Sequence, residues 1–426
     1  MTLSSLASDA AHANDWHRRR VLRRYQWEVL LLGSWVAASG AEFRAVASRG
    51  RYVLVSAAYP DAALITGEVG SAYEITHVVW RGEVYSLTGE NLFPAREADP
   101  VRKYGSSLGD EPETQSLGNR RVLRVGHPNF AHFLWNELPA LVEHEDLLAG
   151  LVERGDLELV LEPHHEEIVD ALGGIDRLLP KLGGKFNSRL TWGGSSVPFG
   201  SMLITSEVQE RVRRSLSGLS RIEVEGPVLW VSVRLPPRSP SNQVEFLIEV
   251  VDRWLSSSAG TVIVDGFATS RSFQPHFADR IAETDSLVKA IADGSSKGTR
   301  RTRVRTTVGM DLAAVLATAA LADYYVSPEG TVQHKLGWVW NKPGAIHIGP
   351  RAHRDAAVRW HGLQVEGGVD PLALPREHVV GEDKQVSPDD RDIRYSICSS
   401  GAVAEWIVER ALHAVATGLS NPMPFS

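Results

Sequence analysis

The sequence predicts an α/β protein built on parallel sheets. From residue 118 onward, short apolar, β-branched runs alternate with segments whose apolar residues recur at helical spacing. This alternation occurs twice, over residues 118–225 and 226–350, and the second series begins after a Gly-Pro break at Gly226 and Pro227. Strand and helix in alternation are typical of βαβ units, in which helices cover the faces of a parallel sheet.

The N-terminal section, residues 1–117, forms a β-containing extension. Residues 51–56 and 73–80 are rich in β-branched and aromatic residues, and the residues between them favour turns. Arg81-Gly82-Glu83 separates residues 73–80 from a further strand-like run, which predicts a hairpin. The polar stretch from residue 94 to 119 is expected to be a loop that leads into the first series.

The first series is expected to hold four strands and several helices. Strands are predicted at residues 121–125, 157–161, 190–192 and 201–204, a long helix as far as about Leu148, and short helices at 166–172 and 175–182. The second series is predicted to hold strands at 228–234, 261–267, 303–308, 323–327 and 345–348, with helices after Asn242, at 311–321 and at 331–340. Asn242 and Glu245 have the spacing of a capping box. Residues 351–426 form a Pro- and charge-rich tail and a closing helix at 403–417.

Composition excludes several classes of protein. The hydrophobic content of 43% and charged content of 23% are globular values. A formal charge of -7 argues against a nucleic-acid-binding protein, which usually carries a basic excess. The single cysteine, Cys398, allows no internal disulfide and no cysteine-based zinc site, which fits a reducing cytoplasm.

The basic residues 17–24 precede an apolar run at residues 29–40, and this order imitates a secretory signal. Glu28 abuts the run, and the run is too short to span a bilayer. A soluble basic helix is therefore expected here, in a cytoplasmic protein. The alternative is a basic patch that rests peripherally on anionic lipid.

Residues 127–139 form the segment on which the functional predictions depend. At about 100° per residue, Asn129, His132 and Asn136 fall within one narrow arc of a helix, and apolar side chains cover the other side. Ordinary solvated helix faces carry Lys, Glu and Arg, so an arc of one His and two Asn is typical of a cleft wall. The alternative is that Asn129 caps the helix and His132 is a core histidine.

The order His-Pro-Asn-Phe-Ala-His-Phe-Leu-Trp-Asn-Glu-Leu-Pro resembles a segment of glycosyltransferase family 61 and related capsular-polysaccharide transferases. The match is short but specific in order and spacing. Together with the two successive Rossmann-like series, it implies the GT-B architecture, in which two Rossmann-like domains face a cleft. The first series would bind the acceptor and the second a nucleotide-sugar donor.

A second constellation lies at residues 324–335. Ligands of parallel α/β sheets bind beyond the carboxyl ends of the strands, and Gly330 permits close approach of a phosphate to the free N–H groups of the next helix. Glu329 and Thr331 flank this glycine, and His334 and Lys335 follow in the first turns of the helix. The segment resembles the Pro-His-Gly-Ala-Gly-Leu turn of the same family, but Glu329 stands where the family has His, and Thr331 replaces a small residue. An ordinary βα turn is the alternative.

Two more strand ends offer polar groups. Arg234 ends the first strand of the second series, where a guanidinium can grip a diphosphate with two hydrogen bonds or make an interdomain salt bridge instead. Asp265 precedes Gly266 at the next strand end. It can accept a hydrogen bond from a sugar or ribose hydroxyl, or it can shape the turn.

Other motifs are discounted as metal or nucleophile sites. His164-His165-Glu166-Glu167 lacks the spacing of a zinc helix. Asp390-Arg391-Asp392 imitates an Asp-x-Asp metal motif but lies in a polar tail, not at the end of a core strand. No metal and no cofactor are therefore expected.

The resemblance implies an inverting, metal-independent glycosyltransferase that moves a sugar from a nucleotide sugar to a glycan or other hydroxyl acceptor. His132 would be the base, Asn136 would position the acceptor, and Glu137 is the second choice of base. Arg234, His334 and Lys335 would offset the charge of the leaving diphosphate. The alternative, favoured by Glu329, is a catalytically silent glycan- or nucleotide-binding protein on the same scaffold.

Overall fold

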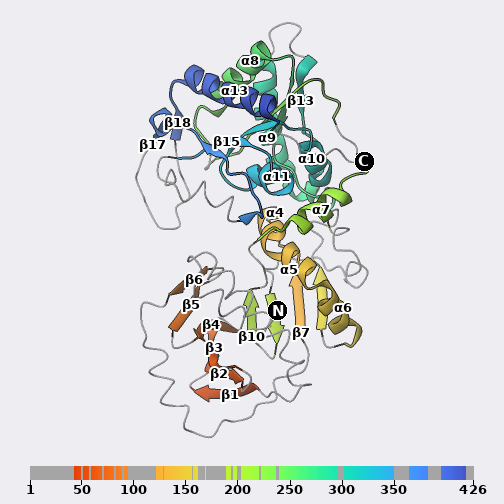
Figure 1. The fold of residues 1–426 in the computed structure, drawn as a ribbon, viewed down its shortest axis with the longest axis vertical. Coiled ribbons are helices and arrows are strands. Elements are labelled where there is room, and N and C mark those ends of the chain that lie inside the picture. Colours follow the sequence, from red (N-terminus) through yellow and green to blue (C-terminus); the bar gives the residue numbers. More distant parts are fainter. Residues whose placement is uncertain are drawn as a thin grey trace. The chain divides into compact units, whose positions relative to one another are not determined.

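A computed structural model describes this fold as two compact units (Figure 1). One unit comprises residues 1–163 and 172–203, and the other residues 164–171 and 204–426. The residues that the structure describes are the strands between 43 and 94, then residues 121–127, 129–155, 157–161, 168, 189–192, 195–198, 203–219, 222–236, 239–295, 302–349, 364–381 and 395–418. Predictions for residues 17–40, 164–167, 175–182 and 390–392 lie outside them. None of the described helices is both long and apolar enough to cross a membrane.

The first unit contains a mixed sheet. Six strands of the N-terminal section, β1 (Phe43–Ser48), β2 (Arg51–Ser56), β3 (Tyr59–Val69), β4 (Ala72–Trp80), β5 (Glu83–Thr88) and β6 (Asn91–Pro94), pair antiparallel in sequence order. The hairpin predicted after Trp80 is confirmed, because Trp80 pairs with Glu83. β4 also pairs parallel with β10 (Ser195–Pro198). The N-terminal section therefore continues the sheet of the first α/β series.

The remaining strands of this sheet are β7 (Arg121–Val125), β8 (Leu157–Leu161) and β9 (Arg189–Trp192). β7 and β8 are parallel and joined through helices, as predicted, whereas β9 runs antiparallel to both β7 and β10. Of the strand predicted at residues 201–204, only residues 203 and 204 are described, and Ile204 forms an isolated parallel bridge with Val365. The first series is thus a βαβ unit extended by antiparallel strands.

The helical connection from β7 to β8 is irregular. It consists of α4 (Phe130–His132), a π-helical segment (Phe133–Glu137), α5 (Leu138–Glu143) and α6 (Glu145–Glu153). The continuous helix predicted as far as Leu148 is wrong in two respects. It is interrupted at His144, which leaves helical geometry at φ -117°, and it ends later, at Glu153.

The second unit is a doubly wound α/β fold around a six-stranded sheet. The order is β13-β12-β11-β14-β15-β16, and every neighbouring pair is parallel. The strands are β11 (Val228–Ser232), β12 (Thr261–Asp265), β13 (Val304–Thr306), β14 (Tyr324–Pro328), β15 (Gly344–His347) and β16 (Leu372–Ala373). Strands β11, β12, β14 and β15 are buried throughout, which explains their unbroken apolar runs. The predicted α/β fold class is confirmed.

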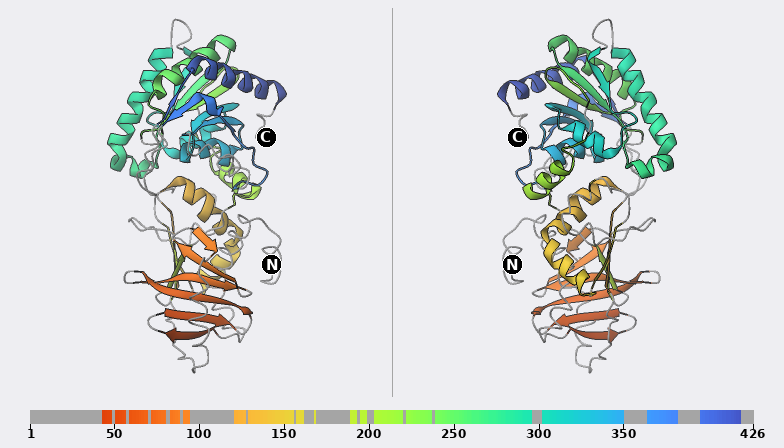
Figure 2. Two further views of the ribbon diagram at one scale, coloured as in Figure 1. Left: turned by 90° about the vertical axis from the view of Figure 1, so that its left-hand side faces the viewer. Right: turned by 90° about the vertical axis from the view of Figure 1, so that its right-hand side faces the viewer.

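Helices cover both faces of this sheet (Figure 2). α8 (Gln243–Ser257), α9 (Ala278–Ser295) and the closing helix α13 (Ser400–Thr417) share one core with the strands, in which Trp254 is fully buried. α10 (Leu312–Ala319) and α11 (Thr331–Trp340) pack against each other, and Trp340 Nε1 donates to the carbonyl of Leu316. α11 begins at Thr331, shortly after β14 ends at Pro328.

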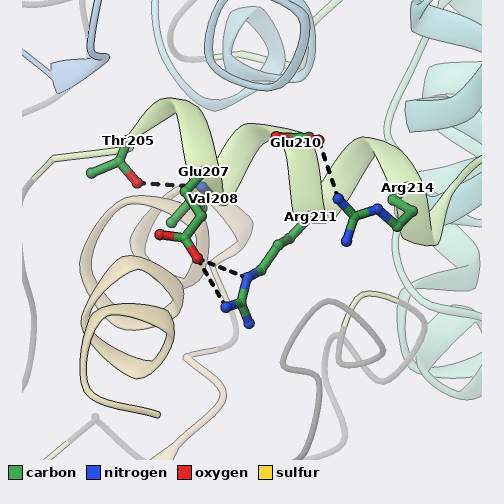
Figure 3. A network of polar contacts seen from close by, with 6 residues as sticks. All are labelled: Thr205, Glu207, Val208, Glu210, Arg211 and Arg214. Carbon is green, nitrogen blue, oxygen red and sulfur yellow. Dashed lines mark hydrogen bonds and ion pairs between the residues drawn. The ribbon is translucent and has the colours of Figure 1, made fainter. Parts of the chain in front are cut away.

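α7 (Ser206–Ser215) packs against α11 and satisfies the carbonyls at its end. Gln209 donates to the carbonyl of Trp338 at 2.6 Å, and Arg213 to that of Val339 at 2.9 Å. Terminal carbonyls lack partners within their own helix, so these bonds stabilise the last turn of α11. On its other side α7 carries the ion pairs Glu207–Arg211 and Glu210–Arg214, and Thr205 caps its start (Figure 3).

The capping box predicted at Asn242 and Glu245 is wrong. α8 does begin after Asn242, but its side chain makes no cap hydrogen bond. The Asn242 amide instead donates to the carbonyl of Ile397 at 2.8 Å and accepts from its N–H at 2.9 Å. Asn242 thus bonds to Ile397 on β18 (Tyr395–Ile397) and not to the N–H groups of its own helix. These bonds join β18 to the start of α8.

Candidate functional site

The second unit has its topological switch point between β11 and β14. β12 lies on one side of β11 and β14 on the other, so the chain leaves the two central strands in opposite directions and the loops beyond their carboxyl ends separate. Arg234 follows β11 there, and Glu329 and Gly330 follow β14. Arg234 Nη1 donates to the carbonyl of Glu329 at 2.8 Å, so the structure brings these predicted site residues together.

Arg234 is held by its backbone as well as by its side chain. The Gln243 side chain accepts from the Arg234 N–H at 3.0 Å and donates to the Arg234 carbonyl at 2.9 Å. Gln243 is itself buried at the start of α8. The backbone N–H and carbonyl of Arg234 are therefore both fixed, and the guanidinium extends from a backbone of defined conformation.

Gly330 is favoured by its own backbone conformation, and Arg234 lies against it. Its φ of +111° lies where side chains are rarely tolerated, and a Cβ built on it would stand 2.6 Å from Arg234 Nη1. Gly330 is the N-cap of α11, whose described first turn has no acidic residue. A guanidinium thus lies against the positive end of a helix dipole, an arrangement that an anion would stabilise.

Thr331 and His334 are partly exposed in the first turns of α11. The His334 ring stacks on Trp338 with centroids 3.4 Å apart and an interplanar angle of 8°. Stacking fixes the ring plane. The assignments of Thr331 and His334 to donor binding stay predictions.

Lys335, Asp265 and Gly266 form a buried group at the end of β12. Lys335 Nζ lies 2.8 Å from Asp265 Oδ2 and 3.1 Å from the Gly266 carbonyl oxygen, and Asp265 Oδ1 accepts from the Thr307 hydroxyl. The Lys335 and Asp265 side chains are 5% and 0% exposed. Gly266 packs against Thr284 of α9, where a Cβ would meet a methyl group at 2.6 Å. These contacts tie the first turns of α11 to the end of β12. They also give Lys335 a partner other than phosphate.

His347 and Tyr395 were missed by sequence reasoning. His347 ends β15, its Nδ1 lies 2.8 Å from the Tyr395 hydroxyl, and its carbonyl accepts from the Glu329 N–H. Burial lowers the pKa of His347 to about 3, which keeps the ring neutral. Burial and the nearby Glu329 raise the pKa of Tyr395, and Arg234 opposes this rise. In the sequence, only the position of His347 at a strand end indicated that it could lie near Glu329 and Arg234.

In the first unit, His132 and Asn136 meet as predicted. Asn136 Nδ2 lies 3.3 Å from His132 Nδ1, and Asn129 caps the helix by accepting from the Ala131 N–H. Asn136 is 6% exposed, and its Oδ1 has no hydrogen-bond partner among the described residues. The Asn136 amide is therefore directed at the histidine and not at solvent.

Glu137, the second candidate base, is 1% exposed. Its carboxylate accepts from the Gly126 N–H at 2.5 Å and from the His127 N–H at 3.1 Å. The helical wheel assumed 100° per residue, but residues 133–137 form a π-helical turn, whose wider spacing redirects every later side chain. Its role as a base stays a prediction, although backbone donors occupy it here.

His127 is a further residue that the sequence did not single out. Its ring centroid lies 4.6 Å from that of His132, with the planes tilted by 46°. The only sequence signal was its place directly after Gly126, at the carboxyl end of β7. Among the described residues, no three His, Cys, Asp or Glu side chains form a cluster that could hold a metal ion.

Comparisons with known proteins give weak likenesses. No family model and no curated protein matches the sequence. Among solved structures, ADP-heptose heptosyltransferase II of E. coli is 12% identical over 65% of this chain and 82% of its own, at a TM-score of 0.32. A glycosyltransferase from Rickettsia africae is 11% identical over 64% and 60%, at 0.21, and S. aureus TarM is 8% identical over 88% and 70%, at 0.23.

The buried ion pair gives the first prediction. Lys335→Met should destabilise the protein by about 3–5 kcal/mol, because the fully buried Asp265 carboxylate loses its charged partner. Adding Asp265→Asn should restore most of that loss, since no unpaired charge remains. Chemical denaturation of the single and double variants measures the coupling. Unchanged stability in Lys335→Met with weakened diphosphate binding would mean that Lys335 contacts the ligand.

The second prediction concerns His347. Its folded pKa of about 3 lies below the unfolded value, so the unfolded chain binds the extra proton and stability falls with acidification below about pH 6.5. Between pH 7 and pH 5 this contribution amounts to about 2 kcal/mol. His347→Gln should remove that part of the pH dependence, whereas His413→Gln, at an exposed position of α13, should not. Equal slopes in the two variants would contradict the assignment.

Proposed function

We propose that this chain is a glycosyltransferase that transfers a sugar from a nucleotide-sugar donor to a hydroxyl acceptor, with inversion and without a metal ion. The observation that carries the proposal is the meeting of Arg234 with the start of α11 at the switch point of the second unit. The resemblance of residues 127–139 to family 61 transferases supports the reaction class. Donor binding is assigned to the second unit and acceptor activation to the first.

The leaving diphosphate develops negative charge as the glycosidic bond breaks, and a metal-free site must offset that charge with fixed donors. Arg234 and the first N–H groups of α11 supply such donors, and Thr331 and His334 lie on the same turns. Gly330 lets the backbone approach the phosphates closely. Asp265, Gly266 and Lys335 hold the turn beneath these donors, and Glu329 contributes its backbone carbonyl and N–H to their placement.

Inversion requires a base for the acceptor hydroxyl, and His132 fits that role in the first unit. A neutral histidine accepts a proton at Nε2 only when Nδ1 carries the other proton. Asn136 lies within reach of Nδ1, and rotation of its amide would place Oδ1 there as an acceptor. Asn136 would then set the tautomer of His132 as well as its orientation.

The alternative function is a catalytically silent glycan- or nucleotide-binding protein. Glu329 favours it, because a carboxylate adjoins the proposed phosphate site. The deciding experiment incubates the purified protein with a panel of nucleotide sugars in EDTA and measures release of nucleoside diphosphate. Release in EDTA supports the transferase. Binding without release supports the alternative, and release that requires added Mn²⁺ or Mg²⁺ would contradict metal independence.

The third prediction tests the donor site. Arg234→Ala should weaken binding of nucleoside diphosphate by about 10- to 150-fold, which corresponds to a charge-assisted bond of about 1.5–3 kcal/mol, and should leave free nucleoside nearly unaffected. Arg214→Ala is the control, because the Arg214 side chain makes only an exposed pair with Glu210 within the described part of the chain (Figure 3). Calorimetric titration measures both ligands. Equal losses for nucleoside and diphosphate would show that Arg234 maintains the fold instead.

The fourth prediction tests the base. His132→Ala should reduce kcat by about 10²- to 10⁴-fold while donor affinity stays near normal, because the assigned role is proton transfer alone. His132→Asn should fold and remain inactive, since an amide is no base near neutral pH. Initial rates and donor titrations separate the two effects. A folded His132→Asn protein with near-native turnover would refute the assignment.

A further inference from the structure

The turn between β7 and α4 is held by a buried carboxylate. Glu137 accepts from two consecutive backbone N–H groups, those of Gly126 and His127, and Gly126 adopts a φ of +106°. Glu137 reaches them from the π-helical segment, eleven residues along the chain from Gly126. Buried charge and π-helical geometry are both unfavourable by themselves, and they tend to occur at functional sites. Here both act on the same turn.

The residue that this turn presents is His127. Its Nδ1 accepts from the Asn129 N–H at 3.0 Å, so Nδ1 carries a lone pair and the proton of the neutral ring is on Nε2. The backbone N–H of His127 is fixed by Glu137, and its ring lies beside that of His132. Three contacts thus determine the position, the orientation and the tautomer of a partly exposed imidazole.

Two adjacent imidazoles suit a hydroxyl substrate. A hydroxyl group donates one hydrogen bond and accepts others, so it is recognised by one acceptor and one donor. With the Asn136 amide turned so that its Oδ1 accepts from Nδ1–H, His132 offers an acceptor at Nε2, and His127 offers an Nε2–H donor. The pair therefore distinguishes a sugar hydroxyl from a carboxylate or a phosphodiester, neither of which offers a proton to His132 at neutral pH.

We propose that His127 is a second histidine of the acceptor site, which donates a hydrogen bond from Nε2 to the acceptor hydroxyl, and that Glu137 is the positioning residue that holds it there. The proposal rests on the proposed function, because it names the group that the acceptor oxygen meets. In this proposal Glu137 transfers no proton; it holds the turn that carries His127. His132 remains the base.

The first experiment needs no activity. Nitrogen-15 NMR of histidine-labelled protein should show His127 as the Nε2–H tautomer, identified by loss of its signals in His127→Gln. Glu137→Gln removes the charge from the turn, so the His127 signals should broaden or shift toward a tautomer mixture. Gly126→Ala should do the same through the backbone. Glu153→Gln, at an exposed end of α6, is the control and should change nothing. An Nδ1–H tautomer for His127, or signals unmoved by Glu137→Gln in a folded protein, would overturn the positioning claim.

The second experiment uses paired substitutions of His127. The amide nitrogen of Gln occupies about the place of Nε2, whereas Asn retains only an acceptor near Nδ1. If His127 donates to the acceptor, His127→Gln should keep most of kcat/KM for the acceptor and His127→Asn should lose about 10-fold, with donor affinity unchanged in both. If His127 only closes the turn, the order reverses. Wild-type protein that transfers no sugar would overturn the proposed function, and the NMR result would then decide the positioning claim alone.

Discussion

The structure of the second unit depends on one constraint, the parallel pairing of β11 with β12 on one side and β14 on the other. Parallel strands direct their carboxyl ends to one edge of the sheet, and crossovers that turn in opposite directions leave the two central loops apart. Arg234 and Gly330 occupy those loops. Their contact therefore bridges two loops that the topology sets apart, and the surrounding residues keep it in place.

Two different kinds of support surround this contact. Gln243 fixes the backbone of Arg234 with neutral hydrogen bonds, whereas Lys335 and Asp265 support the start of α11 with a buried charge pair. Removing one member of a buried pair is costly because the other charge stays unsolvated. Such a pair consequently specifies one arrangement of the turn strongly, even where its net contribution to stability is small. His347 adds a neutral contact, with its carbonyl bound to Glu329.

The sequence predicted β11 to β15 and the helices α8, α10, α11 and α13, because four of these strands are buried throughout and the helices have strong periodicity, but it did not predict α9 or β16. The helix at 331–340 follows from a local pattern alone, and the helix predicted at 311–321 is observed at Leu312–Ala319, with Asp311 as its N-cap. Asn242 shows the limit of such patterns, since its partner Ile397 lies far along the chain. Lys335 and Asp265 were assigned separately to ligands. They meet only because the folded chain places α11 beside the end of β12. Glu137 was predicted only as a second base, because nothing in residues 133–137 signals the π turn from which it reaches the N–H groups of Gly126 and His127.

The two proposed sites are built on the same strand–glycine–helix turn, but side chains of opposite charge lie against it. In each, a strand leads through a glycine at φ of about +110° into a helix, Gly126 at +106° and Gly330 at +111°, and the turn presents backbone N–H groups. At Gly126 these groups already bind the chain's own carboxylate, Glu137, so this turn is neutralised internally and has no capacity left for an anion. At Gly330 the chain places the guanidinium of Arg234 instead, which adds to the positive potential of α11. An anion is thus favoured at Gly330 and disfavoured at Gly126, where the proposed hydroxyl acceptor would meet two histidines. This difference in charge supports the proposal that the donor binds the second unit and the acceptor the first.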